Sequence, residues 1–229
     1  MEPREIVALL RVATPPDDTI LHVAIYTGLR RGELFALQWN DVDWGPGGHG
    51  GRLWIRRSVY RGKLTTPKTE HSIRVVDVTQ RTLDELAVYQ EIFPVLGEGF
   101  IFRTAKGTPF DPDNWYKRRF WPLLEAAGLR KVGLHTLRHT YASLLINQGE
   151  RIKYVSKQLG HASIQITADL YSHLFRETSL AAMQRLEQSI PDREDDPVIS
   201  RKGRPDGDET GWMGKIPSIE HLTEQAKRP

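Results

Sequence analysis

The stretch "LHTLRHTYASLL", residues 134–145, places two histidines and an arginine within five positions at the start of a predicted amphipathic helix. His135 and Arg138 fall in the first turn, where free backbone N–H groups and the positive end of the helix dipole favour an anion. The pattern therefore predicts an anion site, and a phosphate would fit it. We expect His139, four residues after His135, to pack in the core.

A metal site is the alternative interpretation, because His135 and His139 have the i, i+4 spacing of the HExxH zinc motif. The glutamate of that motif is missing, and Arg138 between the histidines would repel a divalent cation. Asp41 and Asp43 could suggest a metal nuclease, but they lack a third acidic partner, and we interpret them as caps of a turn. The sequence favours phosphate over metal, and we expect neither a metal nor another cofactor.

Composition sets wider limits on the protein class. Of the 229 residues, 39% are hydrophobic and 27% are charged, which is typical of a globular protein with a sizeable core. The sequence contains no long apolar run, no secretory leader and no cysteine, so we expect a cytoplasmic protein without a membrane span. Residues 191–229 carry 7 Lys+Arg against 9 Asp+Glu, a net charge of about −2. Since the whole chain has a net charge of +3, residues 1–190 carry about +5. That mildly basic body is compatible with a nucleic acid partner.

Hydrophobic periodicity predicts a mainly helical α+β fold with a small three-stranded antiparallel sheet. The sequence "RLWIRRSVYRGKL" alternates along two arms around Arg61-Gly62, and "SIRVVDV" supplies the third strand. The glycine-rich residues 45–51 lack the Lys-Ser/Thr of a phosphate loop and are interpreted as a connection. We expect one domain over residues 1–190 and a disordered or partner-docking tail over 191–229. The predicted helices cover residues 5–12, 19–26, 31–39, 80–92, 113–127, 136–148, 151–159, 163–173 and 177–189.

Four blocks in order, "YTGLRRGELFALQWNDVDW", "TPKTEHSIRVV", "LHTLRHTYASLL" and "QLGHASIQITADLYSHL", resemble the catalytic domain of tyrosine recombinases, the phage integrase family. The resemblance implies that family's fold and a site-specific DNA recombinase that works through a 3′-phosphotyrosyl intermediate. It implies double-stranded DNA as partner, a homotetramer on paired DNA sites, and no requirement for ATP or metal. By position, it places the catalytic residues on Arg30, Lys68, His135, Arg138, His161 and Tyr171.

Two departures from the family pattern stand out. Thr136 occupies a position where the family more often has aspartate. The catalytic pattern also begins almost at Met1, so we expect the family's N-terminal DNA-clamping domain to be missing and the chain to be either a fragment or a short variant.

These residue types suit phosphodiester cleavage without metal, because Arg30 and Arg138 can each bond non-bridging phosphate oxygens and His161 can add a donor. Tyr171 is a poor nucleophile as a neutral phenol of pKa about 10, and His135 could take its proton. Lys68 could protonate the departing 5′-oxygen.

At individual positions, an ordinary structural role is the alternative to a catalytic one. Arg30 could simply pair with Glu33, and Lys68 could be an ordinary exposed turn lysine. Tyr171 is expected to lie off the core stripe formed by Leu170 and Leu174. The alternative functions are a type IB topoisomerase and a catalytically inactive DNA-binding module of the same fold.

Overall fold

The computed structural model describes residues 1–65, 73–95 and 99–190, without the side chains of 173 and 175–181. Lys68 and the predicted tail, residues 191–229, therefore lie outside the described residues. The chain divides into two compact units, Met1–Ala182 and Met183–Pro229. The predicted boundary at residue 190 stays a prediction.

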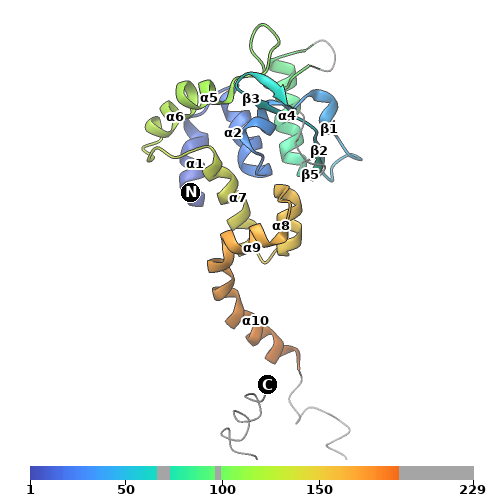
Figure 1. The fold of residues 1–229 in the computed structure, drawn as a ribbon, viewed down its shortest axis with the longest axis vertical. Coiled ribbons are helices and arrows are strands. Elements are labelled where there is room, and N and C mark those ends of the chain that lie inside the picture. Colours follow the sequence, from blue (N-terminus) through green and yellow to red (C-terminus); the bar gives the residue numbers. More distant parts are fainter. Residues whose placement is uncertain (66–72, 96–98, 191–229) are drawn as a thin grey trace, which may run out of the picture. The chain divides into compact units, whose positions relative to one another are not determined.

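The first unit contains nearly all of the described secondary structure (Figure 1). Three short turns accompany the helices: the 3₁₀ turns η1 (Trp39–Asp41) and η4 (Ser172–Leu174) and the π turn η3 (Tyr116–Phe120). The strands are β1 (Val42–Asp43), β2 (Gly51–Ile55), β3 (Ser58–Tyr60), β4 (Lys63–Thr65) and β5 (Arg74–Val78). The helices are α1 (Pro3–Val12), α2 (Asp17–Thr27), α3 (Arg31–Phe35), α4 (Gln80–Ile92), α5 (Pro112–Trp115), α6 (Trp121–Ala126), α7 (His135–Asn147), α8 (Ile152–Leu159), α9 (Ile164–Tyr171) and α10 (Phe175–Ser189).

The predicted helices are confirmed, with three differences. The helix predicted over 163–173 is α-helical to Tyr171 and is followed by the 3₁₀ turn η4. The helix predicted over 31–39 ends at Phe35, and a separate 3₁₀ turn follows at Trp39–Asp41. The helix predicted over 113–127 contains the π turn η3 between α5 and α6. No described helix has both the length and the apolar character needed to cross a membrane.

The predicted three-stranded antiparallel sheet is present, with a different set of strands. Its order is β1-β2-β5, and Leu53 of β2 pairs with Val76 of β5. The two arms around Arg61-Gly62 form the separate hairpin β3-β4, in which both turn residues have positive φ, as a tight hairpin turn requires. The break between β2 and β3 falls at Arg56 and Arg57, because both guanidinium groups bind the buried carboxylate of Asp41.

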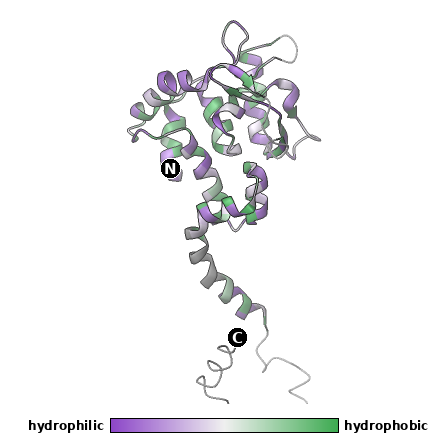
Figure 2. Cartoon of the chain, viewed as in Figure 1, coloured by the Kyte–Doolittle hydropathy of each residue, from purple (hydrophilic) through white to green (hydrophobic). Residues whose placement is uncertain are grey.

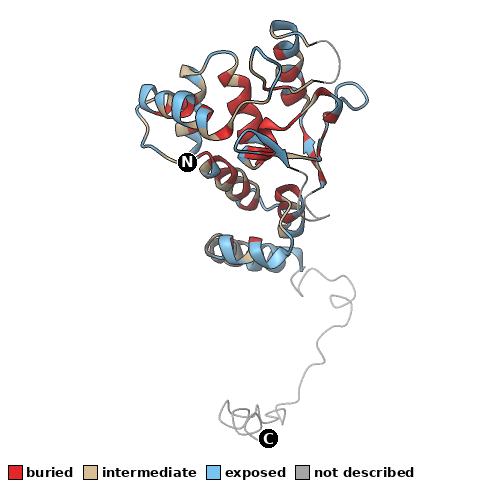
Figure 3. Cartoon of the chain, turned by 45° about the horizontal axis from the view of Figure 1, so that its top comes forward, coloured by how far each residue is buried: buried red, intermediate tan, exposed pale blue. Residues whose placement is uncertain are grey.

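The core of the first unit lies around α2, which is buried along almost its whole length (red in Figure 3). Along the helices, hydrophobic and hydrophilic residues interleave, as expected for elements with one buried face (Figure 2). Asp17, the first residue of α2, is buried and accepts hydrogen bonds from Trp115 Nε1 and Arg119 Nε, both at 2.8 Å. A second, smaller cluster joins α7, α8 and α9, and consists of Ala142, Ile146, Val155, Leu159 and Tyr171.

Candidate active site

Arg138 is a buried cation that joins three helices. It lies in the first turn of α7, is 3% exposed, and donates from Nη1 to the Gly28 carbonyl (2.8 Å) and from Nη2 to the Leu159 carbonyl (2.6 Å). Gly28 ends α2 and Leu159 is the last residue of α8. Burial and the charge of Arg30 lower the pKa of Arg138 to about 9, which leaves the guanidinium charged at pH 7. The group is therefore fixed in place with donors to spare.

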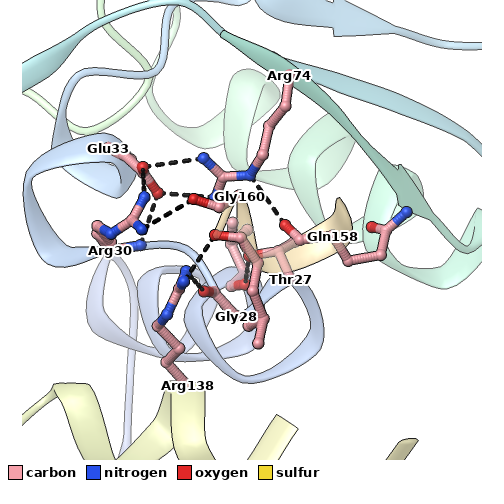
Figure 4. Close-up of polar contacts among 10 residues, drawn as sticks. Thr27, Gly28, Arg30, Glu33, Arg74, Arg138, Gln158 and Gly160 are labelled. Atoms are coloured by element: carbon pink, nitrogen blue, oxygen red, sulfur yellow. Dashed lines mark hydrogen bonds and ion pairs between the residues drawn. The ribbon is translucent and has the colours of Figure 1, made fainter. Parts of the chain in front are cut away.

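Glu33 organises two further arginines (Figure 4). Its carboxylate accepts two bonds of 2.9 Å from Arg74 and one of 2.8 Å from Arg30 Nη1. Arg30 also donates to the Gly160 carbonyl at 3.0 Å, and Arg74 Nε donates to the Gln158 carbonyl at 2.9 Å. Burial alone would raise the pKa of Glu33, but the hydrogen bond and charge of Arg74, with the charge of Arg30, lower it to about 2. The carboxylate is therefore ionised and neutralises part of the arginine charge.

Gly160 lets the end of α8 approach these arginines. Its φ of +65° is the left-handed conformation that ends a helix and favours glycine. A Cβ atom there would lie 2.7 Å from Arg74 Cδ. Gly28 faces a similar limit, since its added Cβ would lie 2.4 Å from Cδ1 of Tyr141.

Two histidines lie in the field of these cations. His161 Nδ1 is 2.8 Å from Thr167 Oγ1, and burial followed by the charges of Arg138 and Arg30 lowers its pKa to about 4. Burial, His139 and Arg138 also lower the pKa of His135, which is exposed at the start of α7. Both imidazoles are therefore neutral at pH 7 in the free chain, and both can donate a hydrogen bond to an anion.

Two of the backbone N–H groups predicted to be free at the start of α7 have partners within the chain. The Thr136 amide donates to the Gly133 carbonyl and the Leu137 amide donates to the Leu134 carbonyl. An anion here would be bound by side chains, chiefly the guanidinium groups of Arg30 and Arg138.

Tyr171 differs from its prediction, because it is 3% exposed and belongs to the small core cluster. Its hydroxyl lies 2.9 Å from Nδ1 of His139. His139, expected in the core, is half-buried and packs edge-on against His135 with ring centroids 4.8 Å apart. Burial raises the pKa of Tyr171, and the nearby charge of Arg138 opposes that rise.

Residues 1–178 match the model of the Phage integrase family. This chain belongs to the phage integrase family. It is 35% identical over 189 residues to the ICEBs1 integrase of Bacillus subtilis (strain 168), an alignment that covers 75% of this chain and 49% of that protein. The chain thus spans about half the length of the curated relatives it matches.

Solved structures of recombinases share the fold of this phage integrase family member. The crystal structure of XerA recombinase has a TM-score of 0.62 and 25% identity, and covers 84% of this chain and 65% of that one. The Tn1549 transposon integrase in complex with transposon right end DNA has a TM-score of 0.69 and 21% identity, and covers 82% of this chain and 65% of that one.

Five of the six predicted site residues lie in the described part of this family member, and four of them share one electrostatic neighbourhood. The charges of Arg30, Arg138 and His135 all act on His161. Of these residues, Arg138 is the one whose charge acts on Tyr171. Lys68 lies outside the described residues. Among the residues that the structure describes, no three His, Asp or Glu side chains gather as a metal site would require.

Three side chains of the site were not predicted to belong to it. The sequence raised Glu33 only as an ion-pair partner that would give Arg30 a purely structural role. The structure contains this Arg30–Glu33 ion pair. Arg74 carries a signal in the sequence, because it occupies an inward position of an alternating strand, where a buried charge needs a partner. His139 has no such signal, since its contact with Tyr171 spans 32 residues.

Proposed function

We propose that this chain is the strand-transferring part of a tyrosine-type site-specific DNA recombinase, with Tyr171 as the nucleophile. The observation that carries the proposal is that Tyr171 lies within the electrostatic reach of the buried Arg138 guanidinium. Residues 1–178 of the same chain match the Phage integrase family. Among the described residues, Arg30, His135 and His161 complete the proposed catalytic set. Lys68, outside the described residues, is proposed to join them.

The arginines supply the charge that the reaction needs. Arg30 has a 40% exposed side chain, so its guanidinium can reach a phosphate while Glu33 holds it. Arg138 is fixed by hydrogen bonds to two carbonyl groups, and the other N–H donors of its guanidinium are left for a phosphate. Such preorganised donors stabilise developing negative charge, and each contributes about 10²- to 10³-fold in rate.

The proposed step balances as follows. The Tyr171 oxygen forms a bond to phosphorus and loses its proton to a base, while the bond from phosphorus to the 5′-oxygen breaks. The 5′-oxygen takes a proton, which we assign to Lys68, and the products are a 3′-phosphotyrosine and a free 5′-hydroxyl. A 5′-hydroxyl from a partner duplex reverses the step, so neither ATP nor a metal ion has to supply energy or charge.

Double-stranded DNA is the proposed partner, bound by a homotetramer on paired sites, and the proposed location is the cytoplasm. The Tn1549 integrase, which shares this fold, is known in complex with transposon right end DNA. The arginine-rich site is compatible with the same class of ligand.

Covalent capture on nicked duplexes tests the proposal. Duplexes that tile the DNA flanking the gene are incubated with the chain, and adducts are separated on denaturing gels. We expect an adduct with the parent chain, none with Tyr171→Phe, and an unchanged yield with Tyr141→Phe as the matched control. An adduct that persists in Tyr171→Phe would refute the assignment.

The adduct assay, plasmid relaxation and chelator treatment together separate the alternative functions. An inactive DNA-binding module would bind the duplexes and form no adduct. A type IB topoisomerase would relax supercoiled plasmid without a defined site. A metal nuclease would lose cleavage in excess chelator and regain it with a divalent ion, whereas the proposed recombinase keeps its cleavage.

A further inference from the structure

The Tyr171 hydroxyl has one hydrogen-bond partner among the described residues, and that partner is His139, at 2.9 Å from Nδ1 to Oη. His135, which the sequence nominated to take the tyrosine proton, instead lies one helical turn away, in edge-on contact with the His139 ring. The ring that touches the nucleophile is therefore a different histidine from the one expected.

The packing holds this contact in place. The Tyr171 ring is enclosed by Ala142 and Ile146 of α7 and by Val155 and Leu159 of α8. His139 comes from the same α7 and is limited on one side by the His135 ring, at an interplanar angle of 89°. Both partners of the hydrogen bond are thus positioned by neighbours that do not take part in it.

Burial and the positive charges that face His139 favour its neutral ring. Arg138 and His135 face it from α7, the amino group of Met1 acts on it from the start of α1, and Glu2 lines the cavity beside it. Burial, Arg138 and that amino group lower the pKa of His139. A neutral imidazole at pH 7 has one nitrogen free to accept a proton.

We propose that His139 Nδ1 accepts the proton of the Tyr171 hydroxyl as that oxygen attacks phosphorus. The inference rests on the proposed function and assigns its general base. The O–H electron pair becomes the bond to phosphorus, the proton moves to Nδ1, and the breaking bond leaves its electron pair on the 5′-oxygen. His135, freed from this role, can donate to a phosphate oxygen.

A cavity beside His139 gives the proton a way out. It has a volume of about 280 Å³, room for several water molecules, and its polar lining includes Thr136, Ser143 and Asn147. The imidazolium formed next to Arg138 is disfavoured, which promotes release of its proton to water in this cavity.

The first test needs no DNA and uses the free chain. Long-range ¹H–¹⁵N NMR correlations of the histidine rings report which nitrogen carries the proton. We expect neutral His139 at pH 7 with its proton on Nε2 and with Nδ1 bare. A proton on Nδ1, or a charged ring, would overturn the proposal.

The second test compares His139→Gln with His135→Gln in single-turnover adduct formation on the nicked flanking duplexes. Loss of a general base slows a reaction by about 10²- to 10⁴-fold, so we expect that loss for His139→Gln with DNA affinity nearly unchanged. A fluorinated tyrosine of lower pKa at position 171 should shrink the His139→Gln loss at least about tenfold. It should leave the His135→Gln loss unchanged, because His135 acts on phosphate.

In this second test, either of two results would overturn the inference: a His139→Gln rate within about threefold of the parent, or a loss that the fluorinated tyrosine does not shrink. These differ from failure of the proposed function, in which the parent chain itself forms no adduct on any flanking duplex.

Discussion

The two halves of the proposed active site are built in opposite ways. The arginine cluster, Arg30, Arg74 and Arg138 with Glu33, is held by charged hydrogen bonds that join α2, α3, β5, α7 and α8. The tyrosine cluster, Tyr171 and His139 with the apolar residues of α7 and α8, has one neutral hydrogen bond. The charge-bearing half is part of the scaffold, whereas Tyr171 is held by apolar packing and that single hydrogen bond.

This difference follows from the cost of burying charge. A buried guanidinium loses its hydration, so each one must be compensated by acceptors, and Arg74 and Arg138 both have such partners. A phenol has a much smaller hydration cost and tolerates a looser environment. We therefore expect the two clusters to respond differently to substitution.

The largest expected effect compares Arg138→Met with Tyr171→Phe. The first leaves two buried carbonyl groups without donors and should lower the free energy of unfolding by about 3 to 5 kcal/mol. The second removes one neutral hydrogen bond and should cost about 1 kcal/mol. Urea denaturation measures both, and equal losses would erase the contrast between the clusters.

Glu33→Gln should reveal the charge in the arginine cluster through pH. The Glu33 pKa falls from its ordinary value of 4.5 to about 2, so its contribution is complete above pH 4.5 and disappears as the pH falls toward 2. That difference corresponds to about 3 kcal/mol. At pH 7 the free energy of unfolding of the parent chain should exceed that of Glu33→Gln by this amount. The two free energies of unfolding should converge near pH 2.

Asp113→Asn is the matched control for that experiment, because Asp113 forms an ion pair with Arg31 in which both side chains are half-exposed. It should cost about 1 kcal/mol or less. A Glu33→Gln loss no larger than this would show that the buried carboxylate does not organise the cluster.

Gly160→Ala should produce a smaller effect, transmitted through Arg74. Its Cβ would meet Arg74 Cδ at 2.7 Å, whereas a Cβ at Gly149, which also has positive φ, meets nothing within 4 Å. Both alanines have the left-handed backbone cost of about 1 kcal/mol. In thermal unfolding, we expect Gly160→Ala to lose about 1 to 2 kcal/mol more of the free energy of unfolding than Gly149→Ala. Its rate of adduct formation should fall by about tenfold. Equal losses at the two glycines would show that Arg74 yields without consequence.

The smallest effect is a titration shift at His161. In the free chain its pKa is about 4, after burial and the charges of Arg138 and Arg30. A bound phosphate offsets those charges, so the midpoint of the His161 ring proton signal should rise by about 1 to 2 in pH when nicked duplex is added. His22, whose pKa of about 4 comes from burial and Arg81, should not move. A constant His161 midpoint would place the phosphate elsewhere.

The sequence predicted those parts of the molecule that depend on neighbouring residues. Helices were found because apolar spacing and terminal glycines such as Gly28 and Gly160 are local signals. The strand break at Arg56 and Arg57 was missed, because it depends on Asp41, which precedes them by 15 and 16 residues.

For the candidate site, the sequence named the residues proposed to act and missed the residues that hold them in place. The order of four motif blocks identified Arg30, Arg138 and Tyr171 together, but the Glu33–Arg74 pair spans 41 residues and has no local pattern. Tyr171 was placed off the core because Leu170 had helical spacing. In the structure α9 turns Tyr171 inward and leaves Leu170 48% exposed, since the packing of α9 against α8 decides which face is buried.

Peptide mapping of the covalent adduct tests the central claim most directly. The parent chain is trapped on a nicked flanking duplex, digested with protease and nuclease, and analysed by mass spectrometry. The account predicts a nucleotide linked through its 3′-phosphate to Tyr171, in a yield that excess chelator does not change. A nucleotide on any other side chain, a 5′-phosphate linkage, or cleaved DNA without a protein link would contradict it.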